Sequence, residues 1–259
     1  MKNFFKILYL TILILTVNYQ VNAAEKVKLL KTDWSFKGLF GKFDRGSLQR
    51  GYQVYSEVCS SCHSMKYVSY RNLSEPGGPE FTEEQVKAIA ASFEVVDGPN
   101  SDGEMFVRPA KLSDKFVMPF ENVKAAQAAN GGAYPPDMSV LAKARSGGVD
   151  YIYSVLLGYE DPPSGVTLDE GVYYNKYMYG NNIKMAKPLS NDLIEYSDGT
   201  VTTEEQMAKD VTTFLMWAAE PHLEARHKMG FKAILYLIIL TILVYFSMKK
   251  IWSRIESEV

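Results

Sequence analysis

The sequence contains only two cysteines and three histidines among its 259 residues, and its net charge is −2. Two cysteines cannot form a disulfide scaffold, and the charge balance excludes a basic protein that coats nucleic acid. No repeat or low-complexity segment is present. With 47% hydrophobic and 22% charged residues, the composition also excludes collagen, a coiled coil and disorder of the whole chain. The length allows one large domain or two small ones.

The first 23 residues have the pattern of a secretory signal peptide. Lys2 and Lys6 come before an apolar run over residues 7–17, and Val21-Asn22-Ala23 supplies small residues where signal peptidase cleaves. We expect cleavage after Ala23, with an uncleaved N-terminal anchor as the alternative. A short leader in place of a long arginine-rich transit peptide favours a bacterial source.

A second apolar run, over residues 231–248, predicts a single transmembrane helix. Eighteen residues give about 27 Å of helix at about 1.5 Å per residue, which matches a hydrocarbon core of about 30 Å. Because basic residues flank both sides of the run, they do not decide its orientation. The signal peptide does, so we expect residues 24–230 to be exported and residues 249–259 to form a short cytoplasmic tail.

The exported part is more acidic than the whole chain. The two terminal segments hold six of the 28 basic and two of the 30 acidic residues, which leaves 22 and 28, a net charge of −6. Such a domain favours a basic protein partner and disfavours nucleic acid. A solvated acidic surface is the simpler alternative.

Both cysteines fall in one motif, Cys59-Ser60-Ser61-Cys62-His63, which is the C-x-x-C-H pattern of covalent c-type haem attachment. Two thiols at this spacing can form thioethers with the two vinyl groups of one porphyrin, and the adjacent imidazole can then ligate the iron. The alternatives are a redox-active thiol pair, which lacks a βαβ context here, and a zinc site completed by His222 and His227. The sequence predicts one haem c, bound through Cys59 and Cys62 and ligated by His63.

Electron transfer through such a haem requires a sixth iron ligand, for which a methionine sulfur is suited because it stabilises the reduced iron. Spacing leaves two good candidates. Met118 precedes a proline, and Met185 lies in a loop bounded by Asn181-Asn182 and Pro188. The other exported methionines considered are Met105, Met138 and Met178.

Two amphipathic helices are expected around the haem. Residues 46–58 carry apolar side chains at helical spacing just before the haem motif. A second helix is expected to start at Thr202, capped by it with Glu205 three residues later, and to end at Pro221. Gly51 would let the two helices cross closely. Residues 75–188 are expected to form long loops with short helices over 82–91 and 151–157.

An ordered set of sequence blocks resembles the cytochrome c1 family, the haem-bearing subunits of cytochrome bc1 complexes, over residues 34–252. In chain order the blocks are Arg50-Gly51-Tyr52-Gln53-Val54-Tyr55, Val58-Cys59-Ser60-Ser61-Cys62-His63-Ser64-Met65, Asp97-Gly98-Pro99-Asn100, Asp102-Gly103-Glu104-Met105, Arg108-Pro109, Pro135-Pro136-Asp137, Ala144-Arg145, Gly147-Gly148, Asp150-Tyr151, Met185-Ala186 with Pro188, Trp217-Ala218-Ala219-Glu220-Pro221 and Met229-Gly230.

The resemblance implies a mostly α, cytochrome c-like haem domain with long loop insertions and one C-terminal transmembrane helix. It implies Met185 as the sixth ligand and Arg145 as the partner of a haem propionate, and it places Tyr151, Pro135 and Pro136 as walls of the haem pocket. The acidic stretch 94–104 resembles the family's docking region for a basic cytochrome c.

By the same resemblance, the chain carries electrons within ubiquinol–cytochrome c reductase and performs no catalysis alone. It would accept an electron from the Rieske iron–sulfur subunit and pass it to a soluble or tethered cytochrome c. Its partners would be cytochrome b, the Rieske subunit and membrane lipid, in a dimeric complex of the bacterial inner membrane with the haem domain in the periplasm. The alternatives are another membrane-anchored monohaem carrier or oxidase subunit, and a sensor or peroxidase with an open sixth position.

Overall fold

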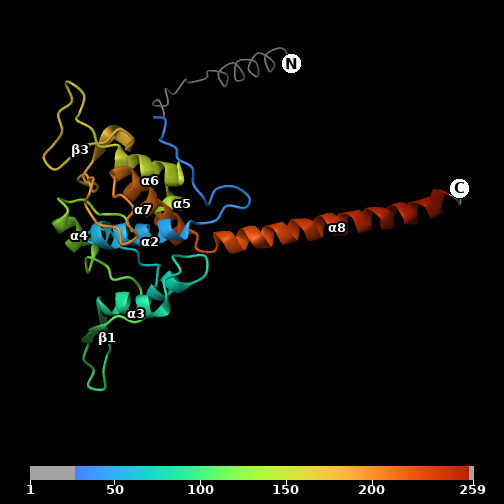
Figure 1. Cartoon of the computed structure of the whole chain (residues 1–259), viewed down its shortest axis with the longest axis horizontal. Helices are drawn as coiled ribbons and strands as arrows, with labels where there is room; N and C mark the ends of the chain where they lie inside the picture. Colours follow the sequence, from blue (N-terminus) through green and yellow to red (C-terminus); the bar gives the residue numbers. More distant parts are fainter. Residues whose placement is uncertain (1–26, 257–259) are drawn as a thin grey trace, which may run out of the picture.

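The computed structural model describes residues 27–256, which form a mostly helical domain with one long helix, α8 (Leu223–Glu256), projecting from it (Figure 1). This confirms the expected fold class of helices, long loops and a single C-terminal apolar helix. The predicted signal peptide, residues 1–23, lies outside the described residues.

Two helices cross at the centre of the domain, α2 (Arg45–Val54) and α7 (Glu204–Ala219). The expected close approach at Gly51 is confirmed. A Cβ on this residue would lie 2.1 Å from the backbone oxygen of Asp210 and 2.7 Å from Cβ of Phe214. Only a glycine allows the backbones of the two helices to meet at this distance.

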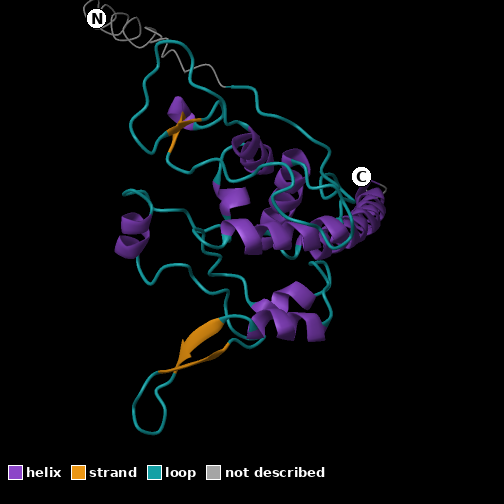
Figure 2. Cartoon of the chain, turned by 60° about the vertical axis from the view of Figure 1, so that its left-hand side comes forward, coloured by secondary structure: helices purple, strands orange, loops and turns teal. Residues whose placement is uncertain are grey.

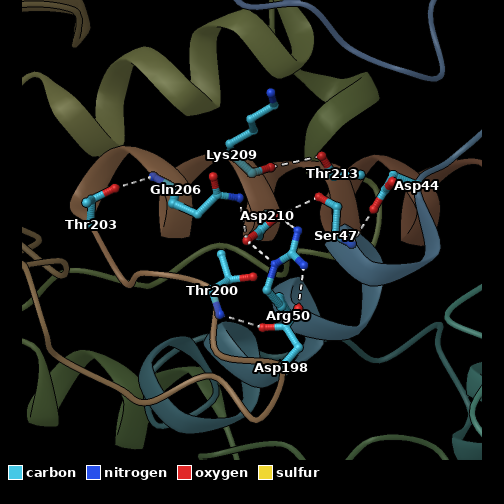
Figure 3. Close-up of polar contacts among 10 residues, drawn as sticks. All are labelled: Asp44, Ser47, Arg50, Asp198, Thr200, Thr203, Gln206, Lys209, Asp210 and Thr213. Atoms are coloured by element: carbon cyan, nitrogen blue, oxygen red, sulfur yellow. Dashed lines mark hydrogen bonds and ion pairs between the residues drawn. The ribbon is translucent and has the colours of Figure 1, made fainter.

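A buried polar network joins the two helices beside this crossing (Figure 3). The Asp210 side chain is fully buried and accepts hydrogen bonds from Ser47 Oγ at 2.6 Å, Arg50 Nε at 2.9 Å and Gln206 Nε2 at 2.9 Å. Arg50 also pairs with Asp198 at 2.7 Å. Since an unpaired buried carboxylate is costly, these donors are what make Asp210 tolerable at the crossing.

Aromatic side chains fill the core around the crossing. The ring of Tyr52 packs edge-on against Phe214 with centroids 5.8 Å apart, and Tyr55 stacks on Phe116 at 5.9 Å. Phe214 in turn contacts Trp217 at 5.4 Å. The apolar spacing of residues 46–58 therefore correctly predicts a buried helix face that points to α7.

The cap predicted for the second long helix is wrong by one residue. Thr203 is the N-cap of α7 and accepts a hydrogen bond from Gln206 N at 3.1 Å. Thr202 is buried instead, and its carbonyl accepts a hydrogen bond from Asp192 N at 2.9 Å. Because the backbone of Thr202 is hydrogen-bonded to the preceding loop, Thr203 is the residue that caps the first turn of α7.

The remaining elements are short and lie around the crossing helices (Figure 2). The helix predicted over 82–91 is confirmed as α3, capped by Thr82, whereas the helix predicted over 151–157 begins three residues earlier as α6. Two hairpins were not predicted, and each is a pair of antiparallel strands. The bounds are η2 (Tyr70–Ser74), α3 (Glu83–Ala91), β1 (Glu94–Asp97), β2 (Phe106–Pro109), α4 (Val123–Ala129), α5 (Leu141–Ala144), α6 (Gly148–Leu157), β3 (Tyr173–Tyr174), η3 (Tyr179–Asn181) and β4 (Asn182–Ile183).

The predicted span, residues 231–248, lies inside α8. Residues Leu223–Arg254 of this helix are long and apolar enough to cross a membrane, and none of the most apolar stretch is buried against the domain. An apolar helix of this length whose most apolar stretch stays unburied is a candidate membrane anchor.

Candidate haem-binding site

The C-x-x-C-H motif begins where α2 ends. The helix continues as one turn of π-helix, η1 (Tyr55–Cys59), closed by a hydrogen bond from Ser60 N to Tyr55 O at 2.8 Å. His63 N then donates to Cys59 O at 2.9 Å. These bonds bring both cysteines and the histidine onto consecutive tight turns. The two cysteines are half-buried free thiols, so the motif is not closed as a disulfide.

The His63 ring is held in one orientation. The side chain is buried, and Nδ1 lies 2.9 Å from the carbonyl oxygen of Pro136. Burial lowers the pKa of His63, which favours the neutral ring with Nδ1–H donating to that carbonyl. This leaves the Nε2 lone pair available to a metal, the usual arrangement of a ligating histidine whose other nitrogen is hydrogen-bonded.

The segment that contains Pro136 is itself fastened to the haem motif. The Asp137 carboxylate accepts hydrogen bonds from Ser64 Oγ at 2.8 Å, Lys66 N at 3.0 Å and Ser139 N at 3.0 Å. Burial raises the pKa of Asp137, but these hydrogen bonds outweigh it and lower the pKa overall. A charged Asp137 therefore clamps the carbonyl of Pro136 against His63. Sequence reasoning missed this role, although the Pro-Pro-Asp block was the available signal.

A cavity of about 210 Å³ opens beside Cys62. Pro135 and Met118 line it together with Cys62, whereas Pro136 acts through its carbonyl. The two prolines predicted as pocket walls thus lie at the motif.

The loop that carries Met185 follows β4 and is held from three directions. Tyr159 Oη donates to the carbonyl of Met185 at 3.0 Å. Lys184 Nζ donates to Gly131 O at 2.7 Å, after α4, and Lys187 pairs with Glu204 at the start of α7. Met185 is half-buried, and within the described residues no hydrogen bond engages its sulfur. Tyr159 was not singled out from the sequence because nothing local marks it.

The other methionines differ in environment. Met138 is buried in the core, Met105 is exposed on the hairpin, and the sulfur of Met178 accepts a hydrogen bond from Tyr151 Oη at 3.1 Å. Met118 is 52% exposed. Of these, Met118 lines the cavity beside Cys62, and Met185 lies in the loop fastened by Tyr159, Lys184 and Lys187.

Arg145 and Tyr151 lie close to each other at the junction of α5 and α6. Arg145 is exposed and forms no ion pair within residues 27–256. Burial raises the pKa of Tyr151, and the positive charge of Arg145 opposes this effect. An unpaired guanidinium of this kind can bind a carboxylate through two parallel hydrogen bonds.

The residues around the motif fit a covalent haem better than the alternatives. Burial, together with the neighbouring Cys62, raises the pKa of the Cys59 thiol to about 12, whereas redox-active thiols have lowered pKa values. Across the described part of the chain, no three His, Cys, Asp or Glu side chains gather as a metal site, so His222 and His227 do not complete a zinc site with the cysteines. A fixed imidazole beside two free thiols is the donor set that haem c requires.

Comparison with known proteins gives consistent matches over most of the chain. Residues 34–255 match the model of the cytochrome C1 family. A protein of Rhodospirillum rubrum named cytochrome c1 is 48% identical over 246 residues, which covers 89% of each chain. A mitochondrial cytochrome c1 haem protein of Arabidopsis thaliana is 50% identical over 225 residues, 87% of this chain and 72% of its own.

A third relative is longer than this chain. The cytochrome b/c1 protein of Bradyrhizobium diazoefficiens is 52% identical over 239 residues, but the match covers 85% of this chain and only 35% of that protein. The chain thus spans about a third of this relative. Because the family model covers residues 34–255, including the haem motif and most of α8, the chain belongs to the cytochrome c1 family.

Proposed function

We propose that this chain is the membrane-anchored electron carrier of a cytochrome bc1 complex. The observation that carries the proposal is the haem motif, in which a hydrogen bond to Pro136 O fixes the His63 ring beside Cys59 and Cys62. When bound, the haem supplies a one-electron ferrous–ferric couple. The polypeptide supplies the attachment, the axial ligands and the docking surface.

Four further residues are proposed to hold the haem. Met185 would supply the second iron ligand, because three contacts fix its loop and no hydrogen bond within the described residues engages its sulfur. Arg145 pairs with a haem propionate, which its exposed and unpaired guanidinium suits. Tyr151 and Pro135 form part of the pocket wall, the latter beside Cys62. With His63 and Met185 both holding the iron, the bound haem would leave no position for a substrate and would need little rearrangement during electron transfer.

The proposed partners follow from the family. Relatives are named as cytochrome b/c1 and as a subunit of the cytochrome b-c1 complex. We infer that this chain accepts electrons from a Rieske iron–sulfur subunit, beside a cytochrome b in a dimeric complex. The quinol chemistry belongs to other subunits. The proposed location is the bacterial inner membrane, with α8 spanning it once and the haem domain in the periplasm.

The hairpin β1–β2 is the proposed docking surface for a basic cytochrome c. Glu94, Asp102 and Glu104 are exposed and form no ion pair within the part of the chain that the structure describes. Asp97 differs, because Arg108 binds it and lowers its pKa. Three uncompensated carboxylates at a projecting hairpin would speed encounter with a cationic partner at low salt.

Replacement of each candidate methionine tests the axial ligand. Met185→Leu is expected to keep covalent haem, to lose the sulfur-to-iron charge-transfer band and to lower the potential by on the order of 0.1 V or more, within the roughly 0.8 V range that axial ligands cover. Met118→Leu is the matched control and should leave both unchanged. If Met118→Leu removes the band instead, the assignment is wrong.

The electron route and the partners need separate tests. Neutralising Glu94, Asp102 and Glu104 should slow reduction of a basic cytochrome c at low salt and flatten the salt dependence, while neutralising the paired Asp97 serves as control. Purification in mild detergent should recover a b-type cytochrome and an iron–sulfur protein with this chain. Recovery of an oxidase instead would show that this chain is a different membrane-anchored electron carrier.

A further inference from the structure

Residues 37–42 form a tight loop that exposes two apolar side chains. Leu39 is 63% exposed and Phe40 is 71% exposed. The loop is closed by hydrogen bonds from Gly41 N to Gly38 O at 3.2 Å and from Lys42 N to Ser35 O at 3.0 Å. Gly38 adopts a φ of 89°, which favours glycine. A defined turn therefore presents the two side chains outward.

This loop is fixed against the first turns of α8, where the apolar run begins. The ring of Phe40 packs edge-on against Phe231, with centroids 5.9 Å apart. Nδ1 of His227 lies 3.3 Å from the carbonyl oxygen of Gly41. Figure 1 shows the loop, in blue, reaching beside the start of α8, on the side from which the helix leaves the domain. With α8 spanning the membrane as proposed, the loop would lie at the level of the membrane surface, because Phe231 is the first residue of the predicted span.

The charges around the loop suit a lipid surface. Lys42, Lys228 and Lys232 are exposed at the same end of the domain. Lys42 and Lys232 form no ion pair within the described residues, whereas the nearby Lys37 pairs with Asp150 at 3.1 Å. Lysines near a membrane surface attract anionic headgroups while their stems lie along apolar surface.

We propose that residues 37–42 are a second membrane contact, in which Leu39 and Phe40 insert into the interfacial region of the bilayer and the three lysines face anionic phosphates. A single spanning helix leaves the domain free to rotate about the helix axis. A second contact beside it fixes which face of the haem domain points away from the membrane. This inference concerns orientation, and it does not depend on the haem ligands or on the electron partners.

The test is a depth measurement on the full-length, haem-loaded chain. Because covalent haem attachment uses the thiols of Cys59 and Cys62, a Phe40→Cys variant carries one free thiol for an environment-sensitive fluorophore. The labelled chain is placed in nanodiscs of phosphatidylcholine and phosphatidylglycerol, and quenching is compared between lipids with a nitroxide at the headgroup and lipids with one deep in the acyl chain. Val96→Cys, which is 68% exposed on β1, and Tyr236→Cys, inside the span, are the matched controls.

The expected result is quenching at position 40 several-fold above that at position 96 and stronger with the headgroup nitroxide, whereas position 236 responds most to the deep nitroxide. Equal quenching at positions 40 and 96 would overturn the proposal. The measurement is repeated in membranes that contain the assembled complex. A blue-shifted emission at position 40 without lipid quenching would show that a neighbouring protein covers the loop, which also overturns it. The haem spectrum of each variant reports separately on the electron-carrier proposal.

Discussion

Replacement of Gly51 by alanine tests the close crossing of α2 and α7. The new methyl carbon would lie 2.1 Å from Asp210 O, against an optimal separation of about 3.5 Å or more for non-bonded contacts. Since the obstacle is backbone, it cannot rotate away, and the cost should reach the upper end of the range for overpacking, about 3 kcal/mol. Alanine regains about 1 kcal/mol of helix propensity. The net loss is about 2 kcal/mol, which lowers the melting temperature by about 4–8 °C for a domain of this size.

The assay is thermal unfolding of the haem-loaded chain in detergent, followed by far-ultraviolet circular dichroism. Gly46→Ala is the matched control on the same helix, because the three atoms nearest its Cβ all belong to side chains, the nearest being Nη1 of Arg50 at 3.2 Å, which needs to shift by only a few tenths of an ångström. This control should melt at the parent temperature or above it. If Gly51→Ala melts at the same temperature as Gly46→Ala, the backbones of α2 and α7 do not meet closely at Gly51.

Three further predictions concern single side chains. Asp210→Asn should lower the free energy of unfolding by about 3 kcal/mol, because it disrupts a buried charge pair. Asp198→Asn, at a side chain that is 43% exposed, should lower it by at most about 1 kcal/mol in the same melting assay. Tyr159→Phe removes a hydrogen bond to Met185 O worth about 1 kcal/mol. With Met185 as the proposed iron ligand, added imidazole should displace its sulfur about five-fold more readily in a spectral titration; unchanged affinity would exclude a positioning role. The pKa of Asp137 is lowered in the folded state, so its stabilisation is present above the unfolded pKa of about 3.9 and is lost as pH falls through the folded value. Asp137→Asn should therefore be less stable than the parent at pH 7, with the gap closing below about pH 4; a gap independent of pH would contradict the clamp.

Local sequence signals predicted the parts of the fold that depend on neighbours in the chain. The spacing of Leu48, Tyr52 and Tyr55 predicted the buried face of α2, and Gly51 predicted the close crossing. The helix over 82–91 was predicted for the same reason, and Thr82 is its cap. At α7 two adjacent threonines could cap, and the choice of Thr203 depends on a loop contact made by Thr202, which no local pattern reveals.

The haem motif could be recognised from five consecutive residues, but the groups that hydrogen-bond to the candidate ligands come from far along the chain. Pro136 O lies 73 residues from the His63 ring that it orients, and Tyr159 lies 26 residues from the Met185 carbonyl. The π-helical turn at 55–59 also escaped prediction, since the sequence there continues an ordinary helical spacing. Tertiary contacts decide each of these features, so single-sequence reasoning can propose ligands but misses the residues that orient them.

The most direct test of the account is the intact mass and visible spectrum of the denatured chain, purified after maturation in its own host. Covalent attachment through Cys59 and Cys62 predicts a mass increased by one haem and a pyridine haemochrome spectrum of two saturated vinyl groups. The Cys59→Ser variant should give the spectrum of a single thioether. A colourless parent chain of unmodified mass would contradict the central claim.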